Sequence, residues 1–365
     1  MTTETSTCVL FTGGGTGGHL FPGVALAREL ARRSPTTRIV FVGSGRDVES
    51  RVLSKEGLSL ERVRAVGLVG RSVTAVARGL AMLPAGFLDA WRVLRRHQPG
   101  LVVGLGGYSS GPVMALAALQ RIPTLLLEQN AVPGVTNRLL SILVRAAAVS
   151  YEAALPHFGS VGFVSGNPVR KGFFDVPAPR PTLTQPHILV LGGSQGAHAV
   201  NLAMIEAVPR ITTAWEEARF THQSGEADLD LVREGYRLAG ATARVEPFLD
   251  GMDREMAEAD VIVCRAGATT LAELAAAGRA AILVPFPHAT HDHQRRNAAV
   301  VAQAGAAEVI DPVDLSGLAL SERLLVLMTD DRRRLALADA NRRLGTPDAA
   351  RLIVDRMERL LARGD

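Results

Sequence analysis

The chain has 365 residues, of which 47% are hydrophobic and 4% aromatic, with 36 glycines and a formal net charge of +4. This length and composition suit two α/β domains, each with its own core, and argue against a β-sandwich. No uninterrupted apolar stretch is long enough to span a membrane, and no basic tail, zinc-ligand spacing or aromatic-rich basic pattern favours nucleic acid as a partner.

A strand, a glycine-rich loop and a helix form the first predicted unit. Residues 9–11 predict a buried strand, and residues 20–30 predict a helix with Pro22 near its start. The loop between them, TGGGTGG at 12–18, directs backbone N–H groups and the positive end of a helix dipole at a phosphate or carbonyl oxygen. His19 lies at the mouth of this predicted site. A glycine turn that only lets the strand and helix pack closely is the alternative.

The same loop matches the G-x-G-x-x-G pattern of dinucleotide-binding folds. Such folds place an acidic residue at the end of the next strand, about 20 residues further on. Here the strand predicted at 38–42 runs into Gly-Ser-Gly-Arg, and the next acid is Asp47. The loop therefore does not predict NAD, and we expect no cofactor.

Residues 71–97 combine apolar side chains with arginines and a single acid, Asp89. The residues concerned are Val73, Val76, Leu80, Met82, Leu83, Phe87, Leu88, Trp91, Val93 and Leu94, with Arg71, Arg78, Arg92, Arg95 and Arg96. An apolar face rimmed by arginines is typical of a protein that rests on an anionic membrane surface. An ordinary domain helix with one face in the core is the alternative.

Strands and helices alternate along the rest of the chain. The predicted strands are 101–103, 123–127, 146–149 and 163–165, then 188–191, 220–222, 243–246, 261–264, 281–284 and 308–310. Parallel sheets with helices on both faces account for this alternation, and prolines at 177–181 mark a linker. We predict two doubly wound, Rossmann-like α/β domains over 1–168 and 169–345, followed by a helical segment at 346–365.

Two further glycine loops, at 104–112 and 191–197, also follow predicted strands. Ligands of doubly wound sheets bind beyond the carboxyl ends of the strands. We therefore expect the chemistry to lie in a cleft between the two domains. Three loops adapted to anions favour a ligand with more than one phosphate, or two phosphorylated substrates.

No metal site is predicted. Cys8 and Cys264 each lie in an apolar run, which indicates buried thiols rather than a disulfide or a metal pair. His288, His291 and His293 form a local cluster, but the second acid that would anchor a hard cation is missing.

Eight sequence blocks occur in an order that resembles the MurG family, the N-acetylglucosaminyltransferases of peptidoglycan synthesis. The blocks are GGTGGHLFPG at 14–23, GGYSSGP at 106–112, EQN at 128–130, GNPVR at 166–170, GGSQG at 192–196, HQSG at 222–225, CRAGATTLAE at 264–273 and DHQRRN at 292–297. They span most of the chain, which makes the resemblance specific.

The resemblance implies inverting transfer of N-acetylglucosamine from UDP-N-acetylglucosamine to lipid I, the undecaprenyl-pyrophosphoryl-MurNAc-pentapeptide, giving lipid II and UDP. It also implies a glycosyltransferase B fold, with an acceptor domain facing the membrane at 1–168 and a donor domain at 169–345. The amphipathic helix at 349–362 is expected to pack back on the N-terminal domain. The protein is then expected to lie peripherally on the cytoplasmic face of the cell membrane.

The resemblance also assigns donor-binding residues. Ser194 matches the family's diphosphate contact, Glu273 its ribose ligand, and Gln294 its contact to sugar hydroxyls through both ends of the amide. The other implied donor contacts are Thr16, Gly17, Gly18, Asn130, Arg170, Leu249, Ala268, Thr269, Thr270, Leu271 and Ala272. Ala266 stands where the family often has serine, so a hydroxyl contact is not expected there.

Two residues compete for the role of catalytic base. His19 has an ordinary pKa near 6.5, which suits removal of a proton near neutral pH. Glu128 follows the predicted strand at 123–127 and is the competitor. His19 in a purely structural or phosphate-binding role is the third alternative.

Two other functions share these features. A UDP-N-acetylglucosamine epimerase has similar paired domains and nucleotide ligands, but needs no surface that faces lipid. A UDP-sugar-binding sensor would bind the donor and release no UDP.

Overall fold

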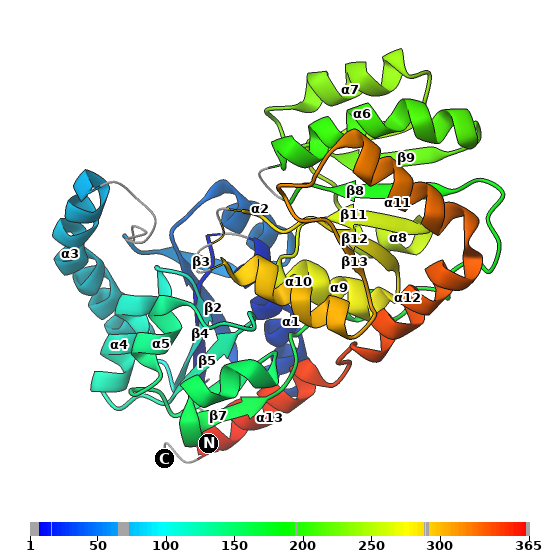
Figure 1. Ribbon diagram of the computed structural model, residues 1–365. Helices are drawn as coiled ribbons and strands as arrows, with labels where there is room; N and C mark the ends of the chain where they lie inside the picture. Colours follow the sequence, from blue (N-terminus) through cyan, green and yellow to red (C-terminus); the bar gives the residue numbers. More distant parts are fainter. Residues whose placement is uncertain are drawn as a thin grey trace. The chain divides into compact units, whose positions relative to one another are not determined.

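The computed structural model describes residues 7–15, 17–64, 73–193, 196–287, 289 and 292–362, with only the backbone at 73–81. The chain divides into two compact units, Met1–Arg170 with Thr346–Asp365, and Lys171–Gly345. Figure 1 shows each unit as a twisted sheet with helices packed on it. The fold is α/β with two Rossmann-like units, as predicted.

The first unit contains a parallel sheet in the order β3-β2-β1-β4-β5-β6-β7. Its strands are β1 Cys8–Gly13, β2 Arg38–Gly43, β3 Ser59–Arg62, β4 Leu101–Gly106, β5 Thr124–Glu128, β6 Ala146–Val149 and β7 Gly162–Val164. Its helices are α1 Gly17–Arg33, α2 Asp47–Lys55, α3 Val73–His97, α4 Ser110–Leu119, α5 Val135–Leu140 and α13 Ala349–Ala362, with short 3₁₀ segments at Glu152–His157 and Gly159–Val161.

Helices cover both faces of this sheet because successive strand residues point to opposite sides. Leu10 of β1 enters a core formed with α3, α4 and α5. Val9 and Phe11 enter the opposite core, formed with α1, α2 and α13. Arg33 near the end of α1 pairs with Asp355 of α13 at 2.6 Å, and Figure 1 shows the two helices side by side. The last helix of the chain is therefore part of the first unit.

The second unit contains a parallel sheet in the order β10-β9-β8-β11-β12-β13. Its strands are β8 His187–Leu191, β9 Arg219–Gln223, β10 Thr242–Glu246, β11 Val261–Cys264, β12 Ala280–Leu283 and β13 Glu308–Val309. Its helices are α6 His198–Ala214, α7 Leu229–Leu238, α8 Met252–Glu258, α9 Ala268–Ala277, α10 His293–Gln303, α11 Gly317–Thr329 and α12 Asp331–Arg343, with a 3₁₀ turn at Lys171–Phe173. Ile188 and Val190 of β8 pack toward α6, α7 and α11.

Strand order reverses once in each sheet, and these reversals locate the candidate sites. In the first sheet the chain moves outward from β1 and then resumes at β4 on its other side. In the second sheet the same reversal separates β8 from β11. Doubly wound sheets bind their ligands at this switch point, beyond the carboxyl ends of the strands.

Each predicted strand has a counterpart, whereas two local predictions need correction. The sequence does not predict β3, a four-residue strand at the sheet edge whose residues Ser-Leu-Glu-Arg contain no apolar run. The first helix begins at Gly17 rather than at residue 20, so Pro22 lies inside the helix and not in its first turn. Proline lacks the N–H that a helix interior uses, so α1 forms one internal hydrogen bond fewer at Pro22.

Candidate active site

Two glycine loops of the first unit lie against each other where strand order reverses. Gly13, Gly14 and Gly15, at the end of β1 and just after it, have φ values of 122°, 134° and 83°. Residues other than glycine rarely adopt such positive φ values. A Cβ at Gly13 would collide with the carbonyl oxygen of Gly106 at the end of β4. The close approach of the two loops therefore requires glycine at residue 13.

His19 lies in the first turn of α1, beside the loop that follows β4. Its Nδ1 is 3.2 Å from Oε1 of Gln129, and Gln129 Nε2 donates to the carbonyl of Leu105 at 2.9 Å. Because a carbonyl can only accept, the amide nitrogen of Gln129 must face Leu105 and its oxygen must face His19. The histidine then carries its hydrogen on Nδ1 and presents Nε2 as the basic nitrogen. This is the tautomer that a general base needs.

Glu128 is buried and accepts hydrogen bonds at both carboxylate oxygens. Oε1 accepts from the backbone N–H of Asn130 at 3.0 Å and from its side chain at 3.2 Å. Oε2 accepts from the N–H of Gly134 at 3.0 Å and from Asn137 Nδ2 at 2.9 Å. These four donors occupy the carboxylate and tie together the loop at 128–137, so Glu128 is arranged to organise that loop.

The predicted contacts Asn130 and Arg170 occupy different places in the first unit. Asn130 turns its amide toward Glu128, while the Arg170 guanidinium lies 5.0 Å from the ring centroid of Phe21 on α1. Gly17 packs closely on the same ring, since a Cβ there would lie 2.9 Å from it. Gly18 is exposed in the same turn, and Thr16 lies outside the described residues.

A glutamine joins two parts of the candidate donor site in the second unit. Gln223, at the end of β9, donates to the carbonyl of Gly193 at 2.7 Å and accepts from the N–H of Leu249 at 3.1 Å. Gly193 lies in the glycine loop after β8, and Leu249 is one of the implied donor contacts. The HQSG block contained this residue, but nothing local indicated its two partners. Ser194 lies outside the described residues.

The N-terminal half of α9 follows β11 at the reversal of strand order in the second sheet. Its residues Ala268, Thr269, Leu271 and Glu273 are buried, and Thr270 and Ala272 are partly buried. Glu273 is therefore a buried residue of the helix, and its role as ribose ligand stays a prediction. Burial, with a smaller contribution from the Glu273 carboxylate, raises the pKa of the Cys264 thiol to about 12. The Glu273 carboxylate is therefore close enough to Cys264, at the carboxyl end of β11, for its charge to contribute to this rise in pKa.

Gln294 has one end of its amide engaged within the protein. Its Oε1 accepts from the backbone N–H of Phe286 at 2.9 Å. The carbonyl end thus holds the segment after β12. Because an amide oxygen can accept a second hydrogen bond, contact of both ends with sugar hydroxyls stays a prediction. The Arg265 guanidinium stacks over the Phe286 ring, 5.5 Å from its centroid. Burial lowers the pKa of Arg265.

The exposed side of α3 presents large apolar residues next to arginines. Phe87, Leu88 and Trp91 are 36%, 44% and 42% exposed, whereas Val93 and Leu94 are buried. The helix therefore has both a core face and an outer apolar face. Its predicted residues Val73, Val76, Leu80 and Arg78 have side chains outside the described part of the structure, as does Arg71.

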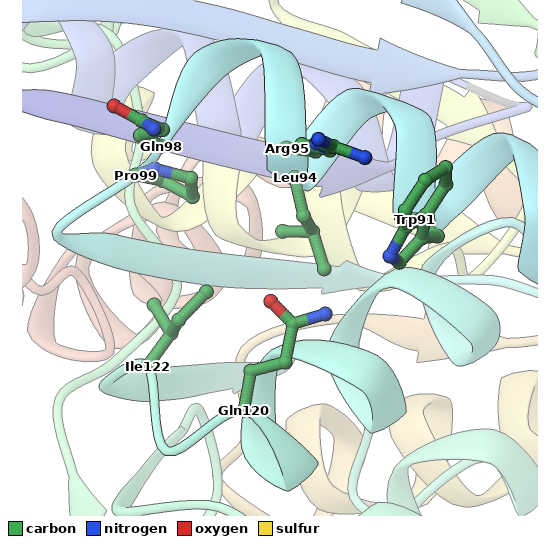
Figure 2. A pocket seen from close by; sticks show the side chains of 7 residues that line it. All are labelled: Trp91, Leu94, Arg95, Gln98, Pro99, Gln120 and Ile122. Carbon is green, nitrogen blue, oxygen red and sulfur yellow. The ribbon is translucent and has the colours of Figure 1, made fainter.

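A cavity of about 410 Å³ adjoins this face of α3. Its lining residues are Trp91, Leu94, Arg95, Gln98, Pro99, Gln120 and Ile122. Figure 2 shows Leu94 pointing from α3 toward Ile122 and Gln120, and the Arg95 guanidinium lies 5.2 Å from the Trp91 ring. Pro99 and Ile122 precede β4 and β5, so the cavity is at the amino ends of these strands. The glycine loops lie at the opposite edge of the sheet.

Both cysteines are buried free thiols, as predicted. Within the described residues, no group of three or more His, Cys, Asp or Glu side chains is arranged to hold a metal ion, and His288 and His291 fall outside this part of the chain. Every helix in the described ranges is too short or too polar to cross a lipid bilayer.

Comparisons with known proteins match nearly the whole chain. Residues 9–149 match the glycosyltransferase family 28 N-terminal domain, and residues 187–353 match the family 28 C-terminal domain. A curated relative from Anaeromyxobacter dehalogenans strain 2CP-1 is 44% identical over 97% of this chain and 93% of its own. A relative from Myxococcus xanthus is 43% identical over 95% of this chain and 91% of its own. Both are named UDP-N-acetylglucosamine–N-acetylmuramyl-(pentapeptide) pyrophosphoryl-undecaprenol N-acetylglucosamine transferase.

Solved structures agree with the sequence relatives. The crystal structure of Acinetobacter baumannii MurG is 28% identical, has a TM-score of 0.77, and covers 97% of this chain and 99% of that one. A UDP-GlcNAc 2-epimerase from Neisseria meningitidis, bound to UDP-GlcNAc, has a TM-score of 0.67 at 12% identity. That likeness covers 97% of this chain and all of the epimerase, and at such low identity it shows the fold alone.

Proposed function

Because this chain belongs to the MurG family within glycosyltransferase family 28, we propose that it transfers N-acetylglucosamine from UDP-N-acetylglucosamine to lipid I, giving lipid II and UDP. The observation that carries the proposal is the 44% identity, over 97% of the chain, to a relative named for this reaction. The reaction belongs to peptidoglycan synthesis and needs no cofactor.

We assign the role of base to His19. In a single displacement with inversion, the muramyl hydroxyl oxygen bonds to the anomeric carbon while the bond from that carbon to the diphosphate oxygen breaks. The electron pair leaves with UDP, and Nε2 of His19 takes the hydroxyl proton. The hydrogen bond between His19 Nδ1 and Gln129 supports this tautomer. Glu128 supports the site through the loop at 128–137, since its lone pairs already accept four hydrogen bonds.

The second unit is proposed to bind the donor. Its glycine loop after β8, which includes Ser194, and the start of α9 would direct backbone N–H groups at the diphosphate as negative charge develops on UDP. Glu273 would accept hydrogen bonds from the ribose hydroxyls, with Leu249 and residues 268–272 around the nucleoside. Gln294, Asn130, Arg170, Thr16, Gly17 and Gly18 remain proposed donor contacts.

The first unit is proposed to bind the acceptor and to rest on the cytoplasmic face of the cell membrane. The outer face of α3 is apolar, with Arg92 and Arg95 beside it. Further exposed apolar side chains, Leu119, Leu139 and Ile142, follow along α4 and α5. Between residues 110 and 145 the only acid is the buried Glu128, while Arg121, Arg138 and Arg145 are basic. Apolar side chains with arginines and few acids suit an anionic membrane surface, and nucleic acid is not a proposed partner.

UDP release with each substrate combination tests the proposed reaction. We expect UDP only when UDP-N-acetylglucosamine and lipid I, or a short-chain lipid I analogue, are both present. An epimerase would convert the donor without the acceptor, and a sensor would bind the donor and release no UDP in any mixture. Either of those results would refute the transferase assignment.

A further inference from the structure

A buried carboxylate lies beneath the first glycine loop. Glu49 on α2 is 1% exposed, and its Oε1 accepts from the backbone N–H of Gly15 at 2.6 Å. Its Oε2 accepts from the N–H of Arg46 at 2.9 Å and from the Ser44 hydroxyl at 3.2 Å. The bond to Arg46 is the ordinary capping-box contact at the start of α2. The bond to Gly15 joins residues 34 apart in sequence and has no part in that cap.

The same α2 cap holds the other polar group of Gly15. Arg46 Nη1 donates to the Gly15 carbonyl at 2.9 Å. The N–H and the C=O of one residue are thus held by two side chains that lie at the start of one helix. Gly15 has a φ of 83°, so these bonds fix it in a conformation that a free loop adopts only as one of several.

Neighbouring glycines make room for the carboxylate. A Cβ at Gly14 would lie 2.6 Å from Glu49 Oε1, and a Cβ at Gly43 would lie 2.8 Å from it. Real Cβ atoms do not approach an oxygen this closely. Part of the glycine motif therefore accommodates a side chain of the protein itself.

We propose that Glu49 is a positioning residue for the transfer reaction, holding Gly15 so that α1 starts in the orientation that directs His19 at the acceptor hydroxyl. The inference rests on the proposed function, because it takes His19 as the base. His19 is four residues after Gly15, in the first turn of α1. Its ring is held on the other side by Gln129 at 3.2 Å, so a shift at the start of α1 would break that contact.

The two hydrogen bonds that Glu49 and Arg46 make with Gly15, here called the clasp, also affect where the donor diphosphate binds. A loop that follows a strand and precedes a helix offers N–H groups to anions. Here the Gly15 N–H is bonded to an internal carboxylate, whose charge repels a second anion at that amide. The Gly15 amide therefore serves the base, and the diphosphate is left to other amides of the candidate site.

Glu49→Gln separates the clasp from the helix cap. Glutamine is an accepted capping-box residue, but Gly15 and Arg46 donate to different oxygens of Glu49, and the NH2 group that replaces one of these oxygens cannot accept. Glu56→Gln is the control, because Glu56 caps the opposite end of α2 and pairs there with Arg28 at 2.6 Å. Glu49→Ala, which removes both bonds, is the second variant.

The hydrogen bond is read directly by NMR, independently of activity. Labelling glycine with ¹³C at the carbonyl and ¹⁵N at the amide selects amides that follow a glycine, including that of Gly15. In the parent we expect the Gly15 amide proton downfield and protected from exchange. In Glu49→Gln or Glu49→Ala it moves upfield and exchanges faster, and in Glu56→Gln it does not move. An unprotected Gly15 amide in the parent would overturn the proposal.

Catalysis is read by a double-mutant cycle with His19→Ala. In the parent background we expect Glu49→Gln to lower kcat about tenfold, with the UDP dissociation constant and binding stoichiometry unchanged within about twofold. In the His19→Ala background, Glu49→Gln should lower kcat by less than about twofold, because the side chain that Glu49 positions is gone. Equal losses in both backgrounds, or a parallel loss of UDP-binding stoichiometry, would reduce Glu49 to a structural residue and overturn the proposal.

The two proposals fail in different ways. If the parent transfers no N-acetylglucosamine to lipid I, the proposed function is wrong, whatever the NMR shows. If the parent is active and Glu49→Gln moves the Gly15 amide without lowering kcat, the transferase assignment stands and the positioning role is refuted. If His19→Ala keeps full kcat, the base assignment and the positioning role fall together.

Discussion

At the scale of single residues, the structure turns His19 from a candidate into an oriented group. Gln129 faces its Nδ1, and the carbonyl of Leu105 sets the orientation of Gln129. Tautomer and ring direction follow from this two-step chain of hydrogen bonds. Glu128 differs from His19 in that both of its carboxylate oxygens already accept hydrogen bonds from its own loop.

His19→Ala is expected to lower kcat by roughly 10²–10⁴ with little change in donor KM, because general-base help is given in the transition state. Steady-state kinetics with both substrates, together with kcat measured against pH, tests this. The acidic limb of the profile should vanish in the variant. A limb that persists in His19→Ala and disappears in Glu128→Gln would move the base to Glu128.

Glu273→Ala is expected to raise the donor KM by about one to two orders of magnitude. Hydrogen bonds to a charged group contribute about 1.5–3 kcal/mol each, and water entering the site recovers part of this loss. Exposed Glu234 on α7, which pairs with Arg237 on the same helix, provides the control Glu234→Ala. A donor KM unchanged by Glu273→Ala would remove Glu273 from the donor site.

His222 is expected to make stability depend on pH. It lies between Asn201 at 3.0 Å and Tyr236 at 3.1 Å, and burial lowers its pKa to about 3. Between about pH 6.5 and 3 the unfolded chain binds a proton here that the folded chain does not. The free energy of unfolding therefore falls as pH falls through this window, by up to about 1.4 kcal/mol per pH unit.

Urea unfolding of a Trp91→Phe background measures this effect, because Trp215 is then the only tryptophan and reports on the second unit. Between pH 6.5 and 5, His222→Gln should flatten the dependence of the unfolding free energy on pH. Exposed His157→Gln should leave that dependence as it is in the background. Equal slopes for the His222 variant and its background would contradict the assignment.

At the scale of elements, α3 has two faces with different surroundings. Val93 and Leu94 pack in the core, while Phe87, Leu88 and Trp91 remain exposed. The arginines of this helix have different neighbours. Arg96 lies 3.2 Å from Glu61 and Arg92 lies 3.7 Å from Asp89, whereas Arg95 stacks on exposed Trp91.

Reversing Arg92 and Arg95 to glutamate is expected to weaken binding to anionic vesicles by about tenfold or more at moderate salt, because each basic residue near such a surface contributes about 1 kcal/mol. Vesicle sedimentation measures the effect. Turnover of a short-chain soluble acceptor should stay within about twofold. Arg332→Glu with Arg343→Glu on α12 makes the same change in net charge and should bind vesicles like the parent. Equal binding by both double variants would refute the membrane face.

At the scale of the whole molecule, each unit places its loops where strand order reverses. Glycine loops follow β1, β4 and β8, and α9 follows β11. Such positions bring backbone N–H groups and helix N-termini together without any contribution from a metal ion.

Chelation by EDTA is therefore expected to leave turnover largely intact. The negative charge that develops on UDP would be stabilised by amides of the second unit rather than by a divalent cation. Initial rates measured with EDTA, with and without added magnesium, test this. Complete loss of activity that magnesium restores would contradict it.

Local sequence pattern predicts most of the fold. Apolar runs bounded by glycine and proline locate the strands, and the alternation with helices predicts parallel sheets because each run can be buried on both faces. The ordered blocks identify the family. The edge strand Ser59–Arg62 was not predicted, because it forms through pairing with β2 and not through apolar content of its own.

The partners of the site residues depend on tertiary structure. His19 meets Gln129 across 110 residues, and Glu49 meets Gly15 across 34. The sequence marked the glycine loop as an anion site, but the anion bound to Gly15 is a carboxylate of the same protein. Hydrogen-bond partners are set by which loops converge at a sheet edge, and that convergence arises from packing between segments far apart in the chain, which no local pattern encodes.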